Sequence, residues 1–380
     1  MLLLAGLLVG CAPSDSPVIA AVKAGNATEL KQLLHGGADP NSLSTAKWPA
    51  IVEAAYRGKT ELVQMLIDAG ADVNAVNGNK FTALTEAAAR GNVPLAEHLL
   101  SKGADQSITT KEGWTSLSVA SLLGKTDVAR LLLQHGANPN VQDEQGQSPL
   151  YLALQFGHAD VAMALLKSGA DASLVPNQGL PSSTLHQAAD EIEDFTVELC
   201  RRLVDAGADI EHAGWNSETP LNQAARRGKN KAVQTLLKCG ATPNTVGGYY
   251  SKTPVMWASA HGDVDLTRVL LDAGAHRVAI AEGDERQLDA LVAAVEAGEP
   301  ATAKLLLSEG ADPDTVIKET GMPLINAAVL YENKDLIEVL LGAGADVKAK
   351  DKDGRTAIDI AQNSSDESIR TMLANTKRKK

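Results

Sequence analysis

The stretch Asp143-Glu144-Gln145-Gly146-Gln147-Ser148-Pro149-Leu150 combines a tight turn with the start of a helix. The aspartate side chain can accept bonds from its own turn backbone, and Gly146 can take the positive φ that closes the turn. Ser148 is a favourable N-cap, and Pro149 suits the first helical position, where its missing N–H costs nothing. Apolar residues then recur at helical spacing in two short runs that are separated at Gly157. The stretch therefore predicts a finger-like turn followed by two short helices.

This unit returns along the chain with a nearly fixed period. Its closing Gly-Ala-Asp, or a close variant, has its glycine at positions 37, 70, 103, 136, 169, 207, 240, 274, 310 and 344. The successive spacings are 33, 33, 33, 33, 38, 33, 34, 36 and 34 residues. A period near 33 residues is typical of an array in which each unit buries its apolar face only against its neighbours. The sequence therefore predicts one long array rather than two or three globular domains.

The pattern resembles the ankyrin repeat, whose consensus has D-x-x-G-x-T-P-L at the first helix and G-A-D-x-N after the second. Such helix starts occur at 219–221, 253–255 and 353–357, and such ends at 70–74 and 136–140. The resemblance implies an all-α ankyrin-repeat solenoid of about ten to eleven helix-turn-helix repeats with short β-turn fingers. Four segments are expected: a signal peptide at 1–10, a lipidated N-terminus and linker at 11–16, the array at 17–376 and a basic tail at 377–380.

Three departures from the consensus stand out. The motif histidine is present at His186, whereas Thr85, Ser118, Tyr151 and Asn222 replace it elsewhere, which leaves its usual hydrogen bonds open. The sixth repeat has an insertion within 187–199 that includes the acidic stretch 190–194. The ninth repeat, near 278–310, has no recognisable D-x-x-G turn at 282–287. A bend or lip in the solenoid is one interpretation of the last two, and a tolerated loop change is the other.

The first residues predict export and lipid attachment. Residues 2–9 are apolar and have the length of the hydrophobic region of a signal peptide, far short of a membrane span. The run ends in Leu8-Val9-Gly10-Cys11, which resembles the lipobox of bacterial lipoproteins, so Cys11 is the expected lipidated residue. Ala12 lacks the aspartate that retains enterobacterial lipoproteins at the inner membrane, which favours the outer membrane facing the periplasm. The alternative is a frayed apolar N-terminus on a cytoplasmic protein, since no basic residue precedes Lys23.

The composition argues against several classes of function. The formal net charge of −12 makes a nucleic-acid backbone an unlikely partner, and the tail 377–380 reads as solvated cations after a helix. No HExxH, CxxC or GxSxG pattern occurs, so neither a metal site nor a catalytic site is predicted, and no cofactor is expected. Cys200 and Cys239 lie at positions offset by about 9 Å along a helix, so a disulfide between them is not expected.

The large side chains point to a binding surface. Trp48, Phe81 and Trp114 occupy the same position, directly before the helix cap, in three consecutive repeats. Four more aromatic residues lie in or beside the fingers of repeats seven and eight: Trp215, Tyr249, Tyr250 and Trp257. In the ankyrin family the fingers and the exposed face of the first helix form a concave surface that holds partners. Aromatic anchors on such a surface are typical of binding hot spots, although rings that merely cover the finger backbone are the alternative.

Together these patterns predict a monomeric, non-enzymatic scaffold that binds another protein and touches the membrane only through its lipid. An immunity-type inhibitor of a secreted toxin or phospholipase, and a cytoplasmic ankyrin regulator, are the two alternatives.

Overall fold

The computed structural model describes residues 15–176, 182–248, 251–280 and 287–376. These residues form two compact units, which are described separately. Unit 1 comprises residues 1–179 with 205–208, and unit 2 comprises residues 180–204 with 209–380. Helix pairs make up nearly all of both units, so the predicted all-α repeat fold is confirmed.

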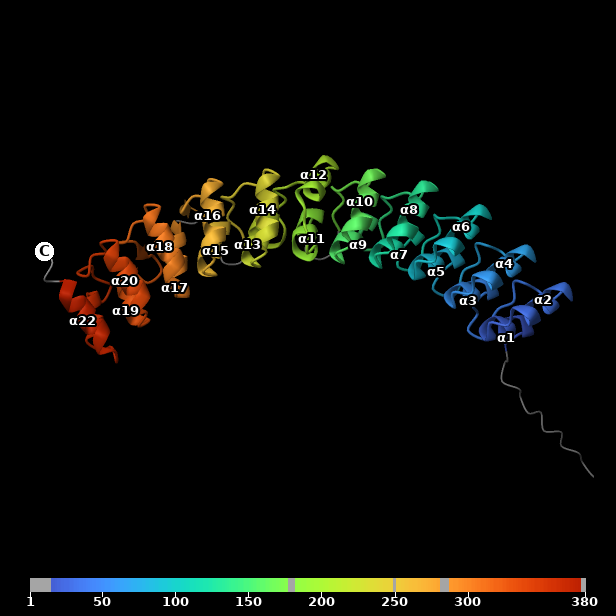
Figure 1. The fold of residues 1–380 in the computed structure, drawn as a ribbon, viewed down its shortest axis with the longest axis horizontal. Helices are drawn as coiled ribbons and strands as arrows, with labels where there is room; N and C mark the ends of the chain where they lie inside the picture. Colours follow the sequence, from blue (N-terminus) through green and yellow to red (C-terminus); the bar gives the residue numbers. More distant parts are fainter. Residues whose placement is uncertain (1–14, 177–181, 249–250, 281–286, 377–380) are drawn as a thin grey trace, which may run out of the picture. The chain divides into compact units, whose positions relative to one another are not determined.

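Unit 1 consists of five helix pairs in two layers (Figure 1). The first helices of the pairs pack side by side. They are α1 (Pro17–Ala24), α3 (Ala50–Tyr56), α5 (Ala83–Arg90), α7 (Ser116–Leu122) and α9 (Pro149–Gln155). The second helices form the other layer: α2 (Ala27–His35), α4 (Thr60–Asp68), α6 (Val93–Ser101), α8 (Thr126–Gln134) and α10 (Ala159–Lys167).

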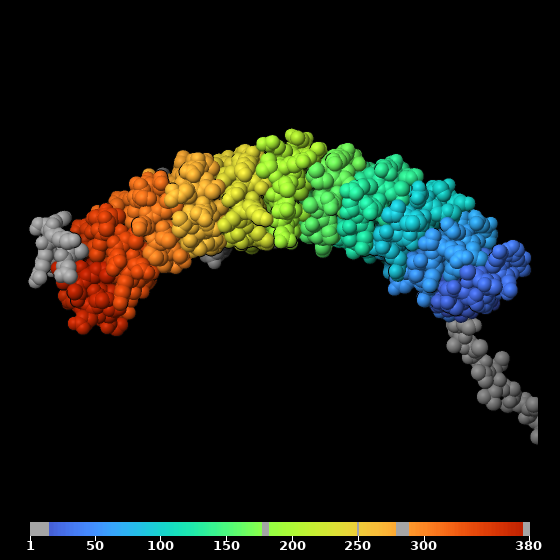
Figure 2. Space-filling view, viewed as in Figure 1, coloured from blue at the N-terminus to red at the C-terminus, as the bar shows by residue number. Residues whose placement is uncertain are grey.

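Unit 2 repeats the same arrangement. Its first helices are α11 (Thr184–Glu191), α13 (Pro220–Arg226), α15 (Pro254–Ala260), α17 (Ala290–Ala297), α19 (Leu324–Leu330) and α21 (Ala357–Ala361). Its second helices are α12 (Val197–Asp205), α14 (Asn230–Lys238), α16 (Val264–Asp272), α18 (Pro300–Ser308), α20 (Lys334–Gly342) and α22 (Glu367–Thr376). The space-filling view shows each repeat lying directly against the next within its unit (Figure 2).

The turn and the helix cap predicted from residues 143–150 are both present. Asp143 Oδ1 accepts hydrogen bonds from the backbone N–H groups of Gln145 (3.0 Å) and Gln147 (2.8 Å), and Gly146 has φ 81°. The Ser148 hydroxyl accepts from the N–H of Tyr151 at 3.2 Å and so caps α9. One side chain therefore orders the finger and the next begins the helix.

A second ladder of hydrogen bonds links neighbouring repeats. Asn41 Oδ1 accepts from the backbone N–H of Asp72, and Asn74 Oδ1 accepts from that of Asp105, each at 2.8 Å. Asn140 makes the same bond to the N–H of Asp171 at 2.8 Å. The asparagine that ends one G-A-D-x-N segment thus fixes the next segment one repeat along.

The insertion of the sixth repeat is part of the core. After α11 the chain turns extended at Ile192, and the side chains of Ile192 and Phe195 are both buried. The Thr235 hydroxyl of the following repeat donates to the Phe195 carbonyl at 2.8 Å. The acidic residues of the insertion face solvent or cations, as in the ion pair of Asp194 with Lys231 at 3.3 Å. The extra residues therefore carry apolar contacts as well as charge.

Short strands replace the finger turn in the ninth and tenth repeats. Strands β1 (Val278–Ile280) and β2 (Gln287–Asp289) pair antiparallel, with Val278 opposite Asp289. Strands β3 (Val316–Ile317) and β4 (Met322–Pro323) pair in the same way. Paired strands thus stand on either side of the segment where the D-x-x-G turn is missing, at 282–287. Residues 281–286 of that segment lie outside the described residues.

The two described cysteines are free thiols, in line with the prediction of no disulfide, but they are closer than their offset suggested. Cys200 is completely buried on α12, and the Cys239 thiol lies 3.9 Å from the Val197 carbonyl on the same helix. Burial raises the pKa of the Cys200 thiol, and a hydrogen bond with Cys239 raises it further. The two cysteines are close because Cys239 directly follows α14 and directs its side chain back onto the preceding repeat.

Candidate functional site

The fingers and the exposed ends of the first helices form the surface that we call the groove face. Trp48, Phe81 and Trp114 occupy equivalent places on it, as predicted. The carbonyl of each accepts a hydrogen bond from the first finger residue of its own repeat: Ser44 (2.8 Å), Asn77 (3.0 Å) and Thr110 (2.9 Å). All three side chains are half-buried. Their backbones therefore close the fingers while part of each ring stays open to solvent.

The rings differ in what they contact. Trp48 meets Tyr56 edge to face, with ring centroids 5.2 Å apart and an interplanar angle of 81°. Trp114 donates its indole N–H to Asp143 Oδ2 at 2.9 Å, which joins the fourth repeat to the finger of the fifth. Trp114 thus has a structural role in the stack, whereas Trp48 belongs to an aromatic pair on the surface.

The helix ends add apolar residues that sequence reasoning missed. Tyr56, Leu123 and Phe156 are 45%, 44% and 52% exposed. Each lies one or two residues before the glycine that separates the two helices of its repeat. That spacing before the glycine was the available signal in the sequence. Unit 1 therefore presents exposed apolar side chains at these helix ends in repeats two, four and five, which we call the apolar row.

The predicted second cluster lies in unit 2. Trp215 begins the 3-10 turn η1 (Trp215–Ser217) and is 60% exposed. Trp257 is half-buried on α15, with the Lys252 ammonium 4.8 Å from its ring centroid and the His261 ring at 6.2 Å. Tyr249 and Tyr250 lie outside the described residues.

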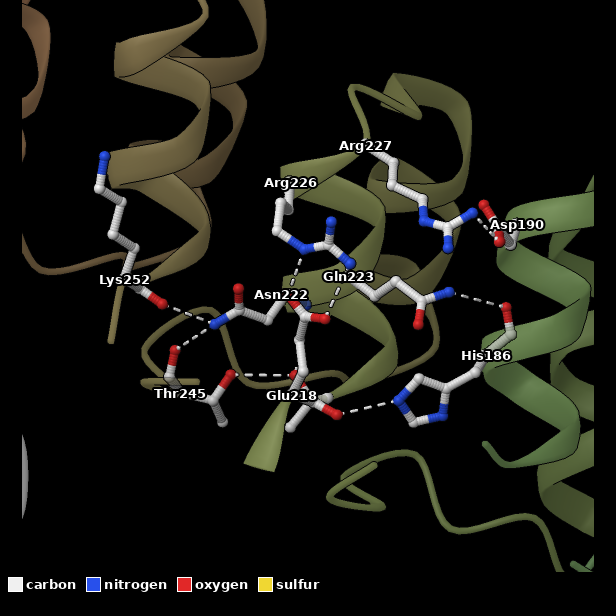
Figure 3. Close-up of polar contacts among 10 residues, drawn as sticks. His186, Asp190, Glu218, Asn222, Gln223, Arg226, Arg227, Thr245 and Lys252 are labelled. Carbon is white, nitrogen blue, oxygen red and sulfur yellow. Dashed lines mark hydrogen bonds and ion pairs between the residues drawn. The ribbon is translucent and has the colours of Figure 1, made fainter. Parts of the chain in front are cut away.

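Polar side chains hold the fingers of unit 2 in place (Figure 3). His186 is buried, its Nδ1 lies 2.8 Å from the Ser183 hydroxyl, and its Nε2 lies 2.9 Å from the Glu218 carbonyl oxygen of the next repeat. Burial lowers the pKa of His186 to about 4, so the ring is neutral near pH 7. Glu218 in turn binds Arg226 through both carboxylate oxygens, at 2.6 and 3.0 Å.

Asparagine takes over the histidine's role in two other repeats. Asn222 Nδ2 donates to the Lys252 carbonyl at 2.8 Å and to the Thr245 carbonyl at 3.1 Å (Figure 3). Asn326 Nδ2 donates to the Arg355 carbonyl at 3.0 Å. Lys252 and Arg355 each directly precede the threonine at the start of a first helix, as Glu218 does. Their carbonyls are therefore equivalent to the Glu218 carbonyl that His186 contacts. In these two repeats an asparagine therefore makes the hydrogen bond to the next repeat that His186 makes in the sixth.

The described residues contain no group of three or more His, Cys, Asp or Glu side chains placed to hold a metal ion. A cavity of about 850 Å³ opens in unit 2 between α15, α17 and the fingers of repeats nine and ten. Its lining mixes cations such as Lys252 and Arg277 with carboxylates such as Glu296 and Glu319. The cavity thus brings together charges of both signs.

Cys11 and the rest of the expected signal segment fall outside the described residues, as does the basic tail 377–380. Within the described ranges, no helix has the length and apolar character needed to cross a membrane.

Comparison with known proteins identifies the repeats. A family model described as ankyrin repeats (3 copies) matches residues 18–110, 84–175, 185–281 and 291–380. Human palmitoyltransferase ZDHHC17 is 26% identical in an alignment of 196 residues that covers 43% of this chain and 31% of the relative. The transient receptor potential cation channel subfamily A member 1 homolog of Caenorhabditis elegans is 27% identical over 165 residues, 43% of this chain and 13% of the relative.

A third relative is the ankyrin repeat, SAM and basic leucine zipper domain-containing protein 1 of Ornithorhynchus anatinus. It is 32% identical over 127 residues, 32% of this chain and 26% of the relative. The chain thus spans less than a third of the length of each of these proteins. The palmitoyltransferase is matched over its ankyrin region only, so the likeness concerns the repeats and not the transferase activity.

Proposed function

This chain belongs to the ankyrin-repeat family, and we propose that it is a non-enzymatic scaffold. In this proposal it holds another protein along its groove face. Ankyrin repeats are in general protein-interaction modules. The observation that carries the proposal for this chain is the row of exposed apolar side chains, Tyr56, Leu123 and Phe156, in unit 1. Grouped apolar exposure of this kind marks interaction sites on soluble proteins.

The energetics favour this surface over the charged remainder of the molecule. An aromatic ring that is covered by a partner and freed from water contributes about 2 kcal/mol or more when it serves as a hot spot. Trp48 already holds Tyr56 in one orientation, so less rotamer freedom is lost when a partner covers the pair.

Affinity capture with substituted proteins tests the proposal. The double variant Leu123→Asp with Phe156→Asp should lose the captured protein while its melting temperature stays near that of the wild type, because both side chains are about half exposed. Arg130→Asp, on the exposed side of α8 in the same repeat as Leu123, is the matched control and should retain capture. Equal capture by all three proteins would contradict a groove-face partner site.

We also propose that the scaffold is attached to a bacterial envelope through a lipid on Cys11. The support is the apolar run that ends in Leu8-Val9-Gly10-Cys11. A fatty-acid probe should label the wild type and leave Cys11→Ser unlabelled; equal labelling would contradict the attachment. If the protein is in the envelope, an immunity-type inhibitor is the alternative to a scaffold. The identity of the captured protein distinguishes these two functions.

A further inference from the structure

Two buried carboxylates lie on the first helices of repeats two and three. Glu53 on α3 is 6% exposed and Glu86 on α5 is 7% exposed. Each directly precedes the paired alanines of its repeat, so the two occupy equivalent positions on helices that pack side by side. A buried carboxylate is unfavourable unless a cation or several donors compensate it, so the surroundings of each are informative.

Only one of the two carboxylates has a partner. Glu53 Oε1 lies 2.6 Å from Arg57 Nε, one helical turn along. The equivalent cation for Glu86 is Arg90, but the Arg90 guanidinium carbon lies instead 5.0 Å from the centroid of the Tyr56 ring. Among the described residues, no hydrogen bond or ion pair within 4 Å involves the Glu86 carboxylate. Burial, with a smaller contribution from Glu53, raises the pKa of Glu86 to about 7, although Arg90 opposes the rise.

Glu86 belongs to the groove face. Residues four apart lie on the same side of a helix, so Glu86 and Arg90 share one face of α5. Arg90 lies over Tyr56, and the Tyr56 ring meets the edge of Trp48. Glu86 therefore lies on the face of α5 from which Arg90 reaches the aromatic pair.

The same positions become apolar in the next two repeats. Val119 on α7 and Leu152 on α9 stand where Glu86 stands on α5, and both are buried. Leu123 and Phe156 are the exposed residues at the ends of those helices. Along unit 1 this position thus changes from a buried acid in repeats two and three to a buried apolar residue in repeats four and five.

We propose that this face binds a polypeptide segment that places a lysine or arginine side chain on Glu86 and apolar side chains against Leu123 and Phe156. The inference rests on the proposed scaffold function and names its partner class. Arg57 and Arg90 are already engaged, which leaves Glu86 as the carboxylate available to a partner's cation.

Repeat geometry sets the spacing that the partner needs. Packed helices lie about 8 to 10 Å apart, so each repeat advances the site by that distance. An extended segment covers it in about three residues. A helical segment needs about six. The partner should therefore carry its cation and successive apolar residues at one of these two spacings.

The test is selection from a random peptide library on the full chain, with the same selection on Glu86→Gln. Peptides selected on the wild type should combine a Lys or Arg with apolar residues at one of the predicted spacings. A selected arginine peptide should bind Glu86→Gln about tenfold more weakly, a loss of the size expected for one charged contact. Glu97→Gln, on α6 of the same repeat and exposed, is the matched control and should bind as the wild type does.

A pH series separates a direct contact from a structural effect. Affinity for the arginine peptide should fall as the pH decreases below about 7, because Glu86 becomes neutral, and should stay flat in Glu86→Gln. The charged groups that act on Glu86 are Arg90 on α5 itself and Glu53 on α3, and α7 contains no charged residue.

Three results would overturn the inference. They are selected peptides without basic residues, equal affinity for the wild type and Glu86→Gln, and no selected peptide at all. If Leu123→Asp with Phe156→Asp abolishes binding and Glu86→Gln does not, the groove face is a binding surface without this cation preference. If neither variant changes the binding of the peptides, the proposed scaffold surface fails as well.

Discussion

Trp114 has a structural role that can be tested separately from partner binding. Its indole N–H bonds Asp143, so Trp114→Phe should remove one hydrogen bond while keeping most of the ring packing. We expect a loss of about 1 kcal/mol in the free energy of unfolding, measured by urea denaturation. Partner capture should be unchanged, because the exposed part of the ring remains. A loss of capture without loss of stability would instead make the indole N–H a binding contact.

Glu86 should destabilise the fold at high pH. Its pKa is about 7 in the folded chain and near 4.5 when unfolded, so the folded state binds more protons between those values. The free energy of unfolding should therefore fall as the pH rises from 4.5 through 7, and the cost should be fully present above pH 7. We expect Glu86→Gln to stabilise the protein at pH 8 on the order of 2 kcal/mol, less than the full shift implies because part of the side chain meets solvent.

The measurement is the difference between wild type and Glu86→Gln in denaturant midpoints across the pH range. The difference is needed because His186 acts in the opposite direction. Its pKa is depressed to about 4, so protonation of the unfolded state reduces stability as the pH falls below 6.5. A difference that does not change with pH would contradict the raised pKa of Glu86.

At the scale of the element, the sequence predicted most of the helix starts because capping is local chemistry. Ser148 and Thr219 each accept from the N–H three residues on, as their sequence contexts indicate. Burial of Ile192 and Phe195 in the insertion was not predictable, since it depends on contacts with the following repeat. The pairing of Glu53 but not Glu86 was equally hidden, because both have an arginine four residues later and only the side-chain conformations differ.

Asn222 should be a main support of the finger in repeat eight. The side chain is completely buried and donates to two carbonyls of that finger. Asn222→Ala should cost about 1 to 3 kcal/mol, because buried carbonyls lose their donor. Asn222→His should retain a good part of that stability, since His186 reaches the equivalent carbonyl through Nε2. Equal loss in both variants, measured by urea denaturation, would mean that the histidine cannot replace the asparagine here.

At the scale of the whole molecule, the array grows by contact between neighbours. The asparagine bonds and the layers of helices join each repeat to the next within its unit. The stability of such a chain is approximately the sum of the repeats and their interfaces. This organisation also explains why relatives with different names match this chain over a fraction of their length: a run of repeats is an independent module.

The last prediction follows from that organisation. Leu132 is completely buried on α8, so Leu132→Ala should cost about 2 to 5 kcal/mol. Because coupling decays from neighbour to neighbour, amide hydrogen exchange should accelerate most in α7 to α10, less in α3 to α6, and hardly at all in α17 to α20. Hydrogen exchange followed by mass spectrometry measures all of these helices at once, with the exposed variant Arg130→Ala as the control. Uniform acceleration throughout the chain would show instead that the array unfolds as a single cooperative body, and a partner held on the groove face of unit 1 would then stabilise unit 2 equally.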